Sequence, residues 1–177
     1  MRKPQRPRPR RHRRRPTASF RRPYASSASV RARAGGARAN RALLLKAERR
    51  LLLLREDTLL VSYDVALGSS PEGPKERLGD GRTPEGHYEI DWRLEDSDYH
   101  RALHVSYPNP ADRARARAEG VAPGGGIMIH GLPSGLGEIG ADHRSGDWTD
   151  GCIAVTNEEM DQIWELIPDG TPIDIVP

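Results

Sequence analysis

Apolar residues in this chain come in short runs, and Gly, Pro or charged residues follow almost every run. Runs of this length that are rich in Leu, Val, Ile and aromatic residues are typical of β-strands. The polar segment Ala-Glu-Arg-Arg separates the first two runs, which predicts a hairpin. We expect strands, in chain order, at 42–46, 51–54, 58–67, 87–94, 102–107, 127–130, 152–155 and 171–176. The sequence therefore predicts a mostly β domain.

Two segments carry helix signals instead. Asn109 followed by Pro110 has the pattern of a helix N-terminus, and Gly120 would end that helix. Thr156 and Glu159 have the spacing of a capping box at the start of a second helix. The apolar face of this second helix would consist of Met160, Ile163, Trp164 and Ile167. We therefore expect one or two short helices beside the strands.

The first 41 residues differ from the rest of the chain in charge. They hold fifteen Lys or Arg and no acidic residue, whereas residues 42–177 hold 13 basic and 25 acidic residues, a net charge of −12. The basic segment lacks the apolar residues that would offset chain entropy, so we expect a disordered tail over 1–41 and one domain over 42–177. Clustered Arg attracts anionic surfaces, but no specific nucleic-acid motif accompanies it, and an unfolded extension is the favoured interpretation.

Signals for export and for disulfide formation are missing as the sequence is written. No run of about 18 apolar residues predicts a membrane span. The basic start is not followed by the apolar core of a signal peptide. The single cysteine, Cys152, excludes an intramolecular disulfide.

Cys152 lies between a polar loop and an apolar run, in the segment DWTDGCIAV. Gly151 permits a backbone conformation that leaves N–H groups free to stabilise an oxyanion. His130 ends the run IMIH, and an imidazole near a thiol can remove its proton and create a nucleophilic thiolate. A lone cysteine is more often a small buried apolar residue, and a lone histidine is more often structural. The neighbouring sequence therefore has to decide between the two interpretations.

The segment IMIHG, a Gly-rich stretch and then TDGCI strongly resemble the catalytic domain of the L,D-transpeptidase (YkuD-type) family. That family has His followed by Gly or Ser, and later Ser/Thr-His-Gly-Cys. Upstream, the loop 68–86 contains DGRTPEG, which resembles the family's substrate loop, and VALG (65–68) resembles the strand end before it. Asn157, which follows the apolar run after Cys152, also matches the family pattern. The resemblance covers 42–177 and implies a mostly β, mixed β-sandwich-like L,D-transpeptidase fold.

The resemblance implies a role for each residue that matches the family's motifs. Cys152 would be the nucleophile and His130 the general base and acid. Gly131 would orient the imidazole through its carbonyl group, and the backbone of Gly151, with Cys152 and Asp150, would form the oxyanion hole. Substrate-binding candidates are Asp150, Thr149, Trp148, Arg144 and Arg82.

Three departures from the family pattern bear on substrate choice. Asp150 stands where the family commonly has His, and a charged carboxylate near the thiol would raise its pKa. Ala154 stands where Arg or Asn is common, and Arg144 or Arg82 would have to supply the missing charge. The segment between His130 and Cys152 is longer than usual, which we interpret as an inserted lid.

Alternative interpretations give the same residues other roles. His130, Asp142, His143 and Cys152 are a conceivable zinc set, although their spacing matches no standard zinc motif. His143 is a second candidate base. A non-catalytic cell-wall-binding module would keep the fold without the chemistry.

The family resemblance implies an enzyme that acts on peptidoglycan stem peptides through a cysteine thioester, without a cofactor or metal. An amine acceptor would give cross-links, water would give L,D-carboxypeptidase activity, and a wall-linked amide donor would give amidase activity. The resemblance also implies action in the periplasm or cell envelope, and we expect a monomer.

Overall fold

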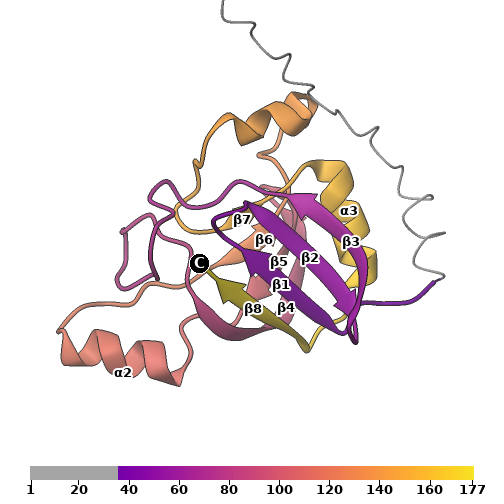
Figure 1. Ribbon diagram of the computed structural model, residues 1–177. Coiled ribbons are helices and arrows are strands. Elements are labelled where there is room, and N and C mark those ends of the chain that lie inside the picture. Colours follow the sequence, from indigo (N-terminus) through magenta and orange to yellow (C-terminus); the bar gives the residue numbers. More distant parts are fainter. Residues whose placement is uncertain (1–35) are drawn as a thin grey trace, which may run out of the picture.

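The computed structural model describes residues 36–177, where eight strands form a single curled mixed sheet in the order β3-β2-β1-β8-β4-β5-β6-β7 (Figure 1). The mostly β fold expected from the sequence is confirmed. Residues 1–35 of the predicted tail lie outside the described residues. Ala39 is already buried in the core, and the first strand begins at Arg41.

The chain begins with a three-stranded antiparallel meander, β1 (Arg41–Leu45), β2 (Arg50–Arg55) and β3 (Thr58–Asp64). The predicted hairpin is confirmed, with Leu43 opposite Leu52. Burial alternates along β1 and β2, because successive side chains of a strand point to opposite faces. The alternation places Leu44, Leu51 and Leu53 in the core.

The last strand joins this meander to the other half of the sheet. Strand β8 (Thr171–Val176) runs parallel to β1 and antiparallel to β4 (Gly86–Ser97). Its Ile173 and Ile175 are buried. The C-terminal strand therefore lies in the middle of the sheet and closes one continuous core beneath both halves.

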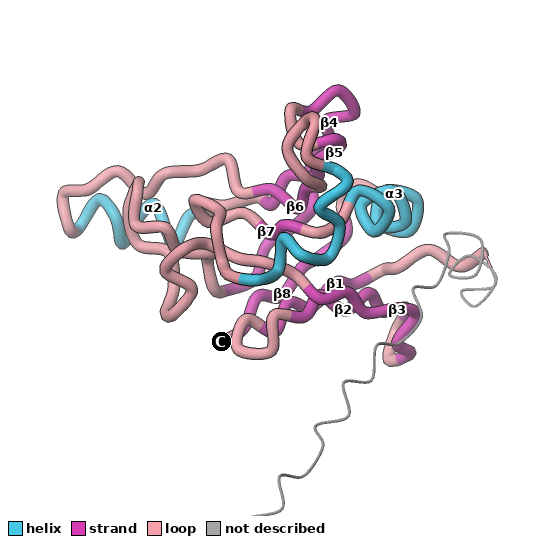
Figure 2. Tube along the Cα trace, turned by 90° about the horizontal axis from the view of Figure 1, so that it is seen from above, coloured by secondary structure: helices cyan, strands magenta, loops and turns pink. Residues whose placement is uncertain are grey.

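The other end of the sheet consists of β4, β5 (His100–Val105), β6 (Met128–His130) and β7 (Ile153–Ala154). Strand β4 is longer than expected, and a register irregularity between Ile90 and Trp92 divides it. Figure 2 shows helix α3 beside the β5–β6 region, and α3 contacts both strands. The opposite face of β4–β7 is therefore the one available to a ligand.

The helices begin where the sequence predicts them. Helix α2 (Pro110–Ala118) is N-capped by Asn109, and Gly120 follows its C-terminus with φ of 69°. Helix α3 (Asn157–Leu166) begins at the Thr156–Glu159 capping box, which is formed in both directions. A third helical segment, η1 (Gly137–Ser145), was not expected; Gly140 interrupts its helical conformation. Within residues 36–177, no helix has the length and apolar character needed to cross a membrane.

The capping box of α3 gives a test of local stability. Thr156 Oγ1 accepts a hydrogen bond from Glu159 N–H at 3.2 Å, and Glu159 accepts one from Thr156 N–H at 3.0 Å. We expect Thr156→Ala to lower the free energy of unfolding by about 1 kcal/mol, because it removes a buried cap. Urea denaturation measures this change. The same substitution at exposed Thr58 is the control, and an equal loss there would contradict the role of the cap.

Candidate active site

The parallel pairing of β6 with β7 determines how the two candidate catalytic side chains are arranged. Ile129 lies opposite Ile153 and His130 lies opposite Ala154. One step earlier in this register, Met128 lies beside Cys152. Side chains alternate between faces along a strand, so His130 and Cys152 project from the same face, while Ile129 and Ile153 enter the core.

Cys152 is half-buried at the start of β7. Its Sγ lies 3.5 Å from the carbonyl oxygen of Gly126, the last residue of the Gly-rich segment before β6, and the thiol donates a hydrogen bond to it. Gly126 has a φ of 66°, in the region that favours glycine. The thiol therefore rests protonated against a backbone carbonyl and has to leave that contact to act as a thiolate.

The turn before Cys152 depends on Gly151 and Thr149. Gly151 has a φ of 128°, and a Cβ on it would lie 2.5 Å from the carbonyl oxygen of Arg82, so no other residue fits here. Thr149 Oγ1 accepts from Gly151 N–H at 3.1 Å and donates to the Cys152 carbonyl at 2.8 Å. The predicted substrate-binding residue Thr149 is thus buried and holds the turn. The Gly151 N–H group already donates a hydrogen bond to Thr149 within this turn.

His130 is held in one tautomer by its neighbour. The side chain is 4% exposed, and its Nδ1 lies 2.7 Å from the Gly131 carbonyl oxygen. A neutral imidazole in this contact carries its proton on Nδ1, which leaves Nε2 as the basic nitrogen. Burial lowers the pKa of His130, and the hydrogen bond to Gly131 opposes this in part. The imidazole is therefore neutral and able to accept a proton at physiological pH.

Burial also keeps the resting thiol protonated. Desolvation raises the pKa of Cys152 above its usual 9.0, and the nearby charge of exposed Asp150 raises it further. The backbone of Met128 and the ammonium group of Lys75 act in the opposite direction. A preformed thiolate–imidazolium pair is therefore disfavoured, and a nucleophilic role for Cys152 would require a base to remove its proton.

Two aromatic side chains lie against the imidazole of His130. The Tyr99 ring centroid lies 4.6 Å and that of Trp148 lies 5.9 Å from the imidazole centroid. Tyr99 comes from the β4–β5 turn, and Trp148 from the loop before Cys152. Both remain more than a third exposed. His143 lies against Trp148, whose Nε1–H donates to His143 Nδ1 at 3.5 Å. Together, the side chains of Tyr99 and Trp148 line the site on the side of His130.

The C-terminal half of the segment interpreted as a lid is tied to the domain at two points. Arg144 of η1 forms an ion pair with Glu159 in α3. Asp147 accepts a hydrogen bond from Leu67 N–H at 2.8 Å and pairs with Arg49 at 2.8 Å. Arg144 therefore lies against α3, and the Glu159 carboxylate neutralises its charge. Leu136 and Ile139, earlier in the segment, are exposed.

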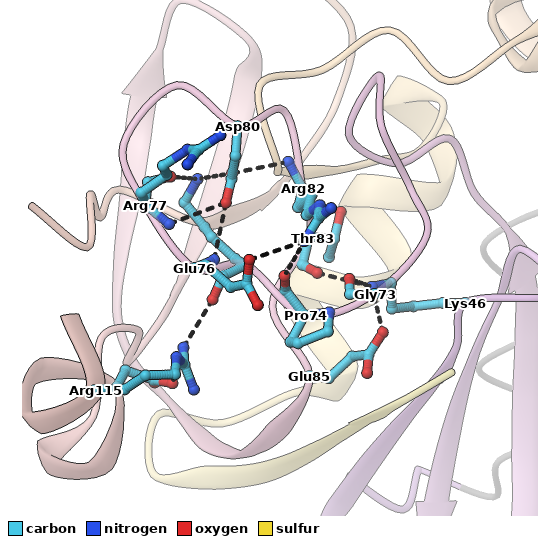
Figure 3. Close-up of polar contacts among 12 residues, drawn as sticks. Lys46, Gly73, Pro74, Glu76, Arg77, Asp80, Arg82, Thr83, Glu85 and Arg115 are labelled. Atoms are coloured by element: carbon cyan, nitrogen blue, oxygen red, sulfur yellow. Dashed lines mark hydrogen bonds and ion pairs between the residues drawn. The ribbon is translucent and has the colours of Figure 1, made fainter. Parts of the chain in front are cut away.

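Buried Lys46 and Lys75 hold the loop 68–86, and Figure 3 shows the contacts of Lys46. Lys46 Nζ donates to the carbonyl groups of Gly73 and Thr83 and to Glu85 at 2.6–2.9 Å. Lys75 and Asp80 form a second ion pair at 2.7 Å, with both side chains at most 7% exposed. Backbone N–H groups and Lys75 lower the pKa of Asp80 to about 2 against the effect of burial. These contacts hold the loop beside the Cys152 turn.

Arg82, predicted to bind substrate, has its guanidinium directed to the loop itself. Its Nη1 lies 3.2 Å from Glu76 Oε2 and 3.4 Å from the Pro74 carbonyl oxygen. Its own carbonyl group is the one that packs on Gly151. Buried Ala154 presents no side chain that replaces the family's polar residue. Neither Arg82 nor Arg144 therefore supplies a free positive charge in this conformation.

The alternative zinc site is not formed. Within the part of the chain that the structure describes, no three His, Cys, Asp or Glu side chains gather in a way that would hold a metal ion. His143, a ligand in that interpretation, lies in a buried position, and burial with the charge of Arg144 lowers its pKa to about 4. A proton on His143 is therefore disfavoured at neutral pH.

Several residues around the site were not singled out from the sequence. Tyr99, Asp147 and Lys75 each contact it through a turn or loop, where no periodic pattern marks a functional residue. Asn157, noted only as a family match, supports the backbone of the site. Its Oδ1 accepts a hydrogen bond from Leu132 N–H at 2.8 Å and so positions the chain after His130.

Comparison with known proteins agrees with this architecture. Residues 39–175 match the sequence model of the L,D-transpeptidase catalytic domain family, called YkuD. YafK of Escherichia coli (strain K12), a candidate L,D-transpeptidase, is 32% identical over 111 residues, or 62% of this chain. This chain spans only 37% of the length of that curated relative.

Solved structures share the fold at low sequence identity. Bd1075 of Bdellovibrio bacteriovorus is 24% identical with a TM-score of 0.55, and the match covers 80% of this chain and 49% of that one. The helical cell shape determining protein Pgp2 of Campylobacter jejuni is 21% identical with a TM-score of 0.56, and the match covers 85% of this chain and 55% of that one. The Enterococcus faecium L,D-transpeptidase C442S mutant is 13% identical with a TM-score of 0.52, and the match covers 79% of this chain and 50% of that one.

The charge of Asp150 is open to a direct test. We expect Asp150→Asn to lower the pKa of the Cys152 thiol and to raise its alkylation rate by iodoacetamide at pH 7 by about twofold, since solvent screens an exposed charge. The measurement is the alkylation rate against pH. Asp142→Asn is the control, and an unchanged rate in Asp150→Asn would show that this charge does not reach the thiol.

The buried His143 predicts a pH dependence of stability. Its pKa is about 4 when folded and close to the usual 6.5 when unfolded, so the unfolded chain binds more protons between these values. Stability is therefore lost as pH falls from 6.5 toward 4. We expect His143→Phe to reduce the loss of unfolding free energy between pH 7.5 and pH 5 by up to about 2 kcal/mol.

Urea denaturation at the two pH values measures this difference. Ser145→Ala, an exposed substitution in the same segment, should keep the wild-type pH dependence. A His143→Phe variant with an unchanged difference between the two pH values would contradict the assignment.

Proposed function

We propose, from the premise that this chain belongs to the L,D-transpeptidase catalytic domain family, that it is a cysteine acyltransferase acting on peptidoglycan stem peptides. The observation that carries the proposal is the placement of Cys152 and His130 on one sheet face, with His130 Nδ1 held by the Gly131 carbonyl. A binding module has no need of a buried neutral imidazole beside a thiol. The stem peptides lie in the cell envelope, where we propose that the protein acts.

In the proposed first half-reaction, His130 Nε2 takes the proton of Cys152. The thiolate attacks the carbonyl carbon of the diamino acid at stem position three, and an oxyanion forms. The backbone N–H of Cys152 is the proposed donor to that oxyanion, presented by the turn that Gly151 and Thr149 hold. The C–N bond to the terminal D-Ala then breaks. Its nitrogen receives the proton from His130, and a thioester remains on Cys152.

In the second half-reaction, His130 removes a proton from an acceptor that attacks the thioester. An amine of a neighbouring stem forms a new amide bond and a cross-link, and the thiol receives the proton back. Water as the acceptor gives a free carboxylate, which is L,D-carboxypeptidase activity. A wall-linked amide as donor gives amidase activity by the same steps. Each outcome uses only side chains and backbone groups of this chain.

One observation favours water as a competing acceptor. His130 is 4% exposed, and Tyr99 and Trp148 cover the side from which an acceptor would approach its imidazole. A water molecule reaches a buried base more easily than the side chain of a second stem peptide. Hydrolysis is therefore the second candidate reaction of this site.

The proposal is tested with purified protein and a defined stem tetrapeptide. We expect D-Ala release by the wild-type protein, and a loss of at least about a thousandfold in Cys152→Ala, which has no nucleophile. His130→Ala should lose at least about a hundredfold because the base is missing. Mass spectrometry of products, with and without an added amine acceptor, distinguishes cross-linking from hydrolysis.

Circular dichroism shows whether each variant is folded. Ser134→Ala, an exposed substitution after β6, is the control and should retain wild-type turnover. Undiminished D-Ala release by folded Cys152→Ala would end the mechanism. No release by the wild-type protein, and no thioester on its thiol, would favour the binding-module alternative.

A further inference from the structure

A second aromatic group lies on the same face of the sheet as Cys152, on the side away from Tyr99 and Trp148. Across β4 and β5, Trp92 lies opposite His104, and across β5 and β6, His104 lies opposite Met128. Met128 lies beside Cys152 in the β6–β7 register. Residues directly opposite one another on neighbouring strands share a face. A row of four side chains therefore crosses the sheet from Trp92 to the thiol.

A β-bulge turns Trp92 to this face. Ile90 is buried in the core, and a regular strand would also direct a side chain two residues later into the core. The register shift between Ile90 and Trp92 reverses the alternation, so that Arg93 packs over Trp164 of α3 and Trp92 points outward. Bulges commonly re-aim a side chain near a functional site.

The indole of Trp92 is both ordered and accessible. It stacks on the His104 imidazole with centroids 4.6 Å apart and an angle of 15° between the rings. His104 Nδ1 lies 2.6 Å from Asp91 Oδ1, so the Asp91 carboxylate fixes the orientation of the His104 imidazole. Trp92 nevertheless stays 45% exposed. The arrangement is a flat apolar surface with polar groups at its edge.

We propose that the Trp92–His104 pair is a sugar subsite, which holds a pyranose ring of the glycan strand whose stem peptide reaches Cys152. This inference rests on the proposed function. The C–H face of a pyranose ring packs on a flat aromatic ring, and its hydroxyl and N-acetyl groups hydrogen-bond to polar side chains nearby. His104 supports one face of the indole, and Asp91, which bonds to His104 Nδ1 and is 37% exposed, is the polar side chain placed to make such bonds.

The length of the row matches the length of the substrate. Three strand spacings separate Trp92 from Cys152, which is about 14 Å. From the scissile carbonyl of stem position three back to the start of the peptide, three extended residues span about 10 Å. The link from the peptide to the sugar ring supplies the rest. A stem peptide laid across β6 and β5 therefore brings its sugar over Trp92.

The other side of Cys152 offers less room for the glycan. Beyond β7 the sheet continues only as bridges from Ala66 to Ala154 and from Gly68 to Thr149 within the described residues. The loop 68–86 follows there, held by the buried Lys75–Asp80 pair. The Tyr99–Trp148 wall stands beside His130. The row through Met128 and His104 is thus the direction in which the substrate extends.

The test compares two substrates that differ only in the sugar: a disaccharide tetrapeptide and the free tetrapeptide. We expect Trp92→Ala to lower kcat/KM about tenfold on the disaccharide tetrapeptide and to leave kcat/KM on the free tetrapeptide within about twofold of wild type. Trp92→Tyr keeps a ring and should recover most of the loss. Leu59→Ala, an exposed apolar substitution on β3, is the control and should change neither value.

Equal effects of Trp92→Ala on both substrates, or no effect on either, would overturn the sugar subsite while leaving the proposed function intact. If the wild-type protein turns over neither substrate, the proposed function fails. Binding then decides the subsite separately: a chitotetraose titration of the Cys152→Ala protein, followed by isothermal titration calorimetry, should saturate. The Cys152→Ala/Trp92→Ala protein should not saturate. Failure of the first titration, or an equal response in both proteins, would overturn the inference.

Discussion

The short parallel pairing of β6 with β7 is the constraint on which the rest of the site depends. Only Ile129–Ile153 and His130–Ala154 form the ladder, yet this register alone places the imidazole and the thiol on one face. A shift by one residue would send one of them into the core. The pairing is reinforced from the other side, where Ala154 exchanges backbone hydrogen bonds with Ala66 at 2.8 and 3.0 Å. The strand that follows Cys152 is therefore short but paired along both edges.

Burial then sets the chemistry that this geometry allows. Desolvation lowers the pKa of His130 and raises that of Cys152, so both groups are neutral at rest. The same burial strengthens any charge interaction that forms during reaction, because the surroundings screen it less than water does. In the proposed mechanism the site therefore holds no permanently reactive thiolate, and one forms only when substrate displaces the contact of the thiol with Gly126. Asp150 moves the resting balance further toward the protonated thiol.

Local signals in the sequence were sufficient for elements whose ends are set by their own residues. The caps at Asn109 and Thr156 predicted where both α-helices begin, because a capping side chain bonds to backbone within three residues. Short apolar runs on either side of a polar turn predicted β1 and β2, although the runs themselves do not alternate and so did not show which side chains are buried. The sequence did not predict that β8 lies between β1 and β4, because this pairing joins segments that are far apart along the chain. Nor did it predict η1, which has no side-chain N-cap and is interrupted at Gly140.

The residues of the candidate site also differ in whether local sequence signals mark them. Cys152 and His130 could be singled out because short motifs surround them, whereas Tyr99 enters through a hairpin turn that no motif marks. The predicted binding residues Arg82 and Arg144 show the limit of reading charge from sequence, since both guanidinium groups are paired within the domain. With these charges paired and Ala154 small, we propose that the described residues at the thiol recognise a substrate mainly through shape, aromatic surface and backbone groups. Recognition of that kind requires a rigid frame, and the buried Lys46 and Lys75 contacts supply it by fixing the loop 68–86 against the Cys152 turn.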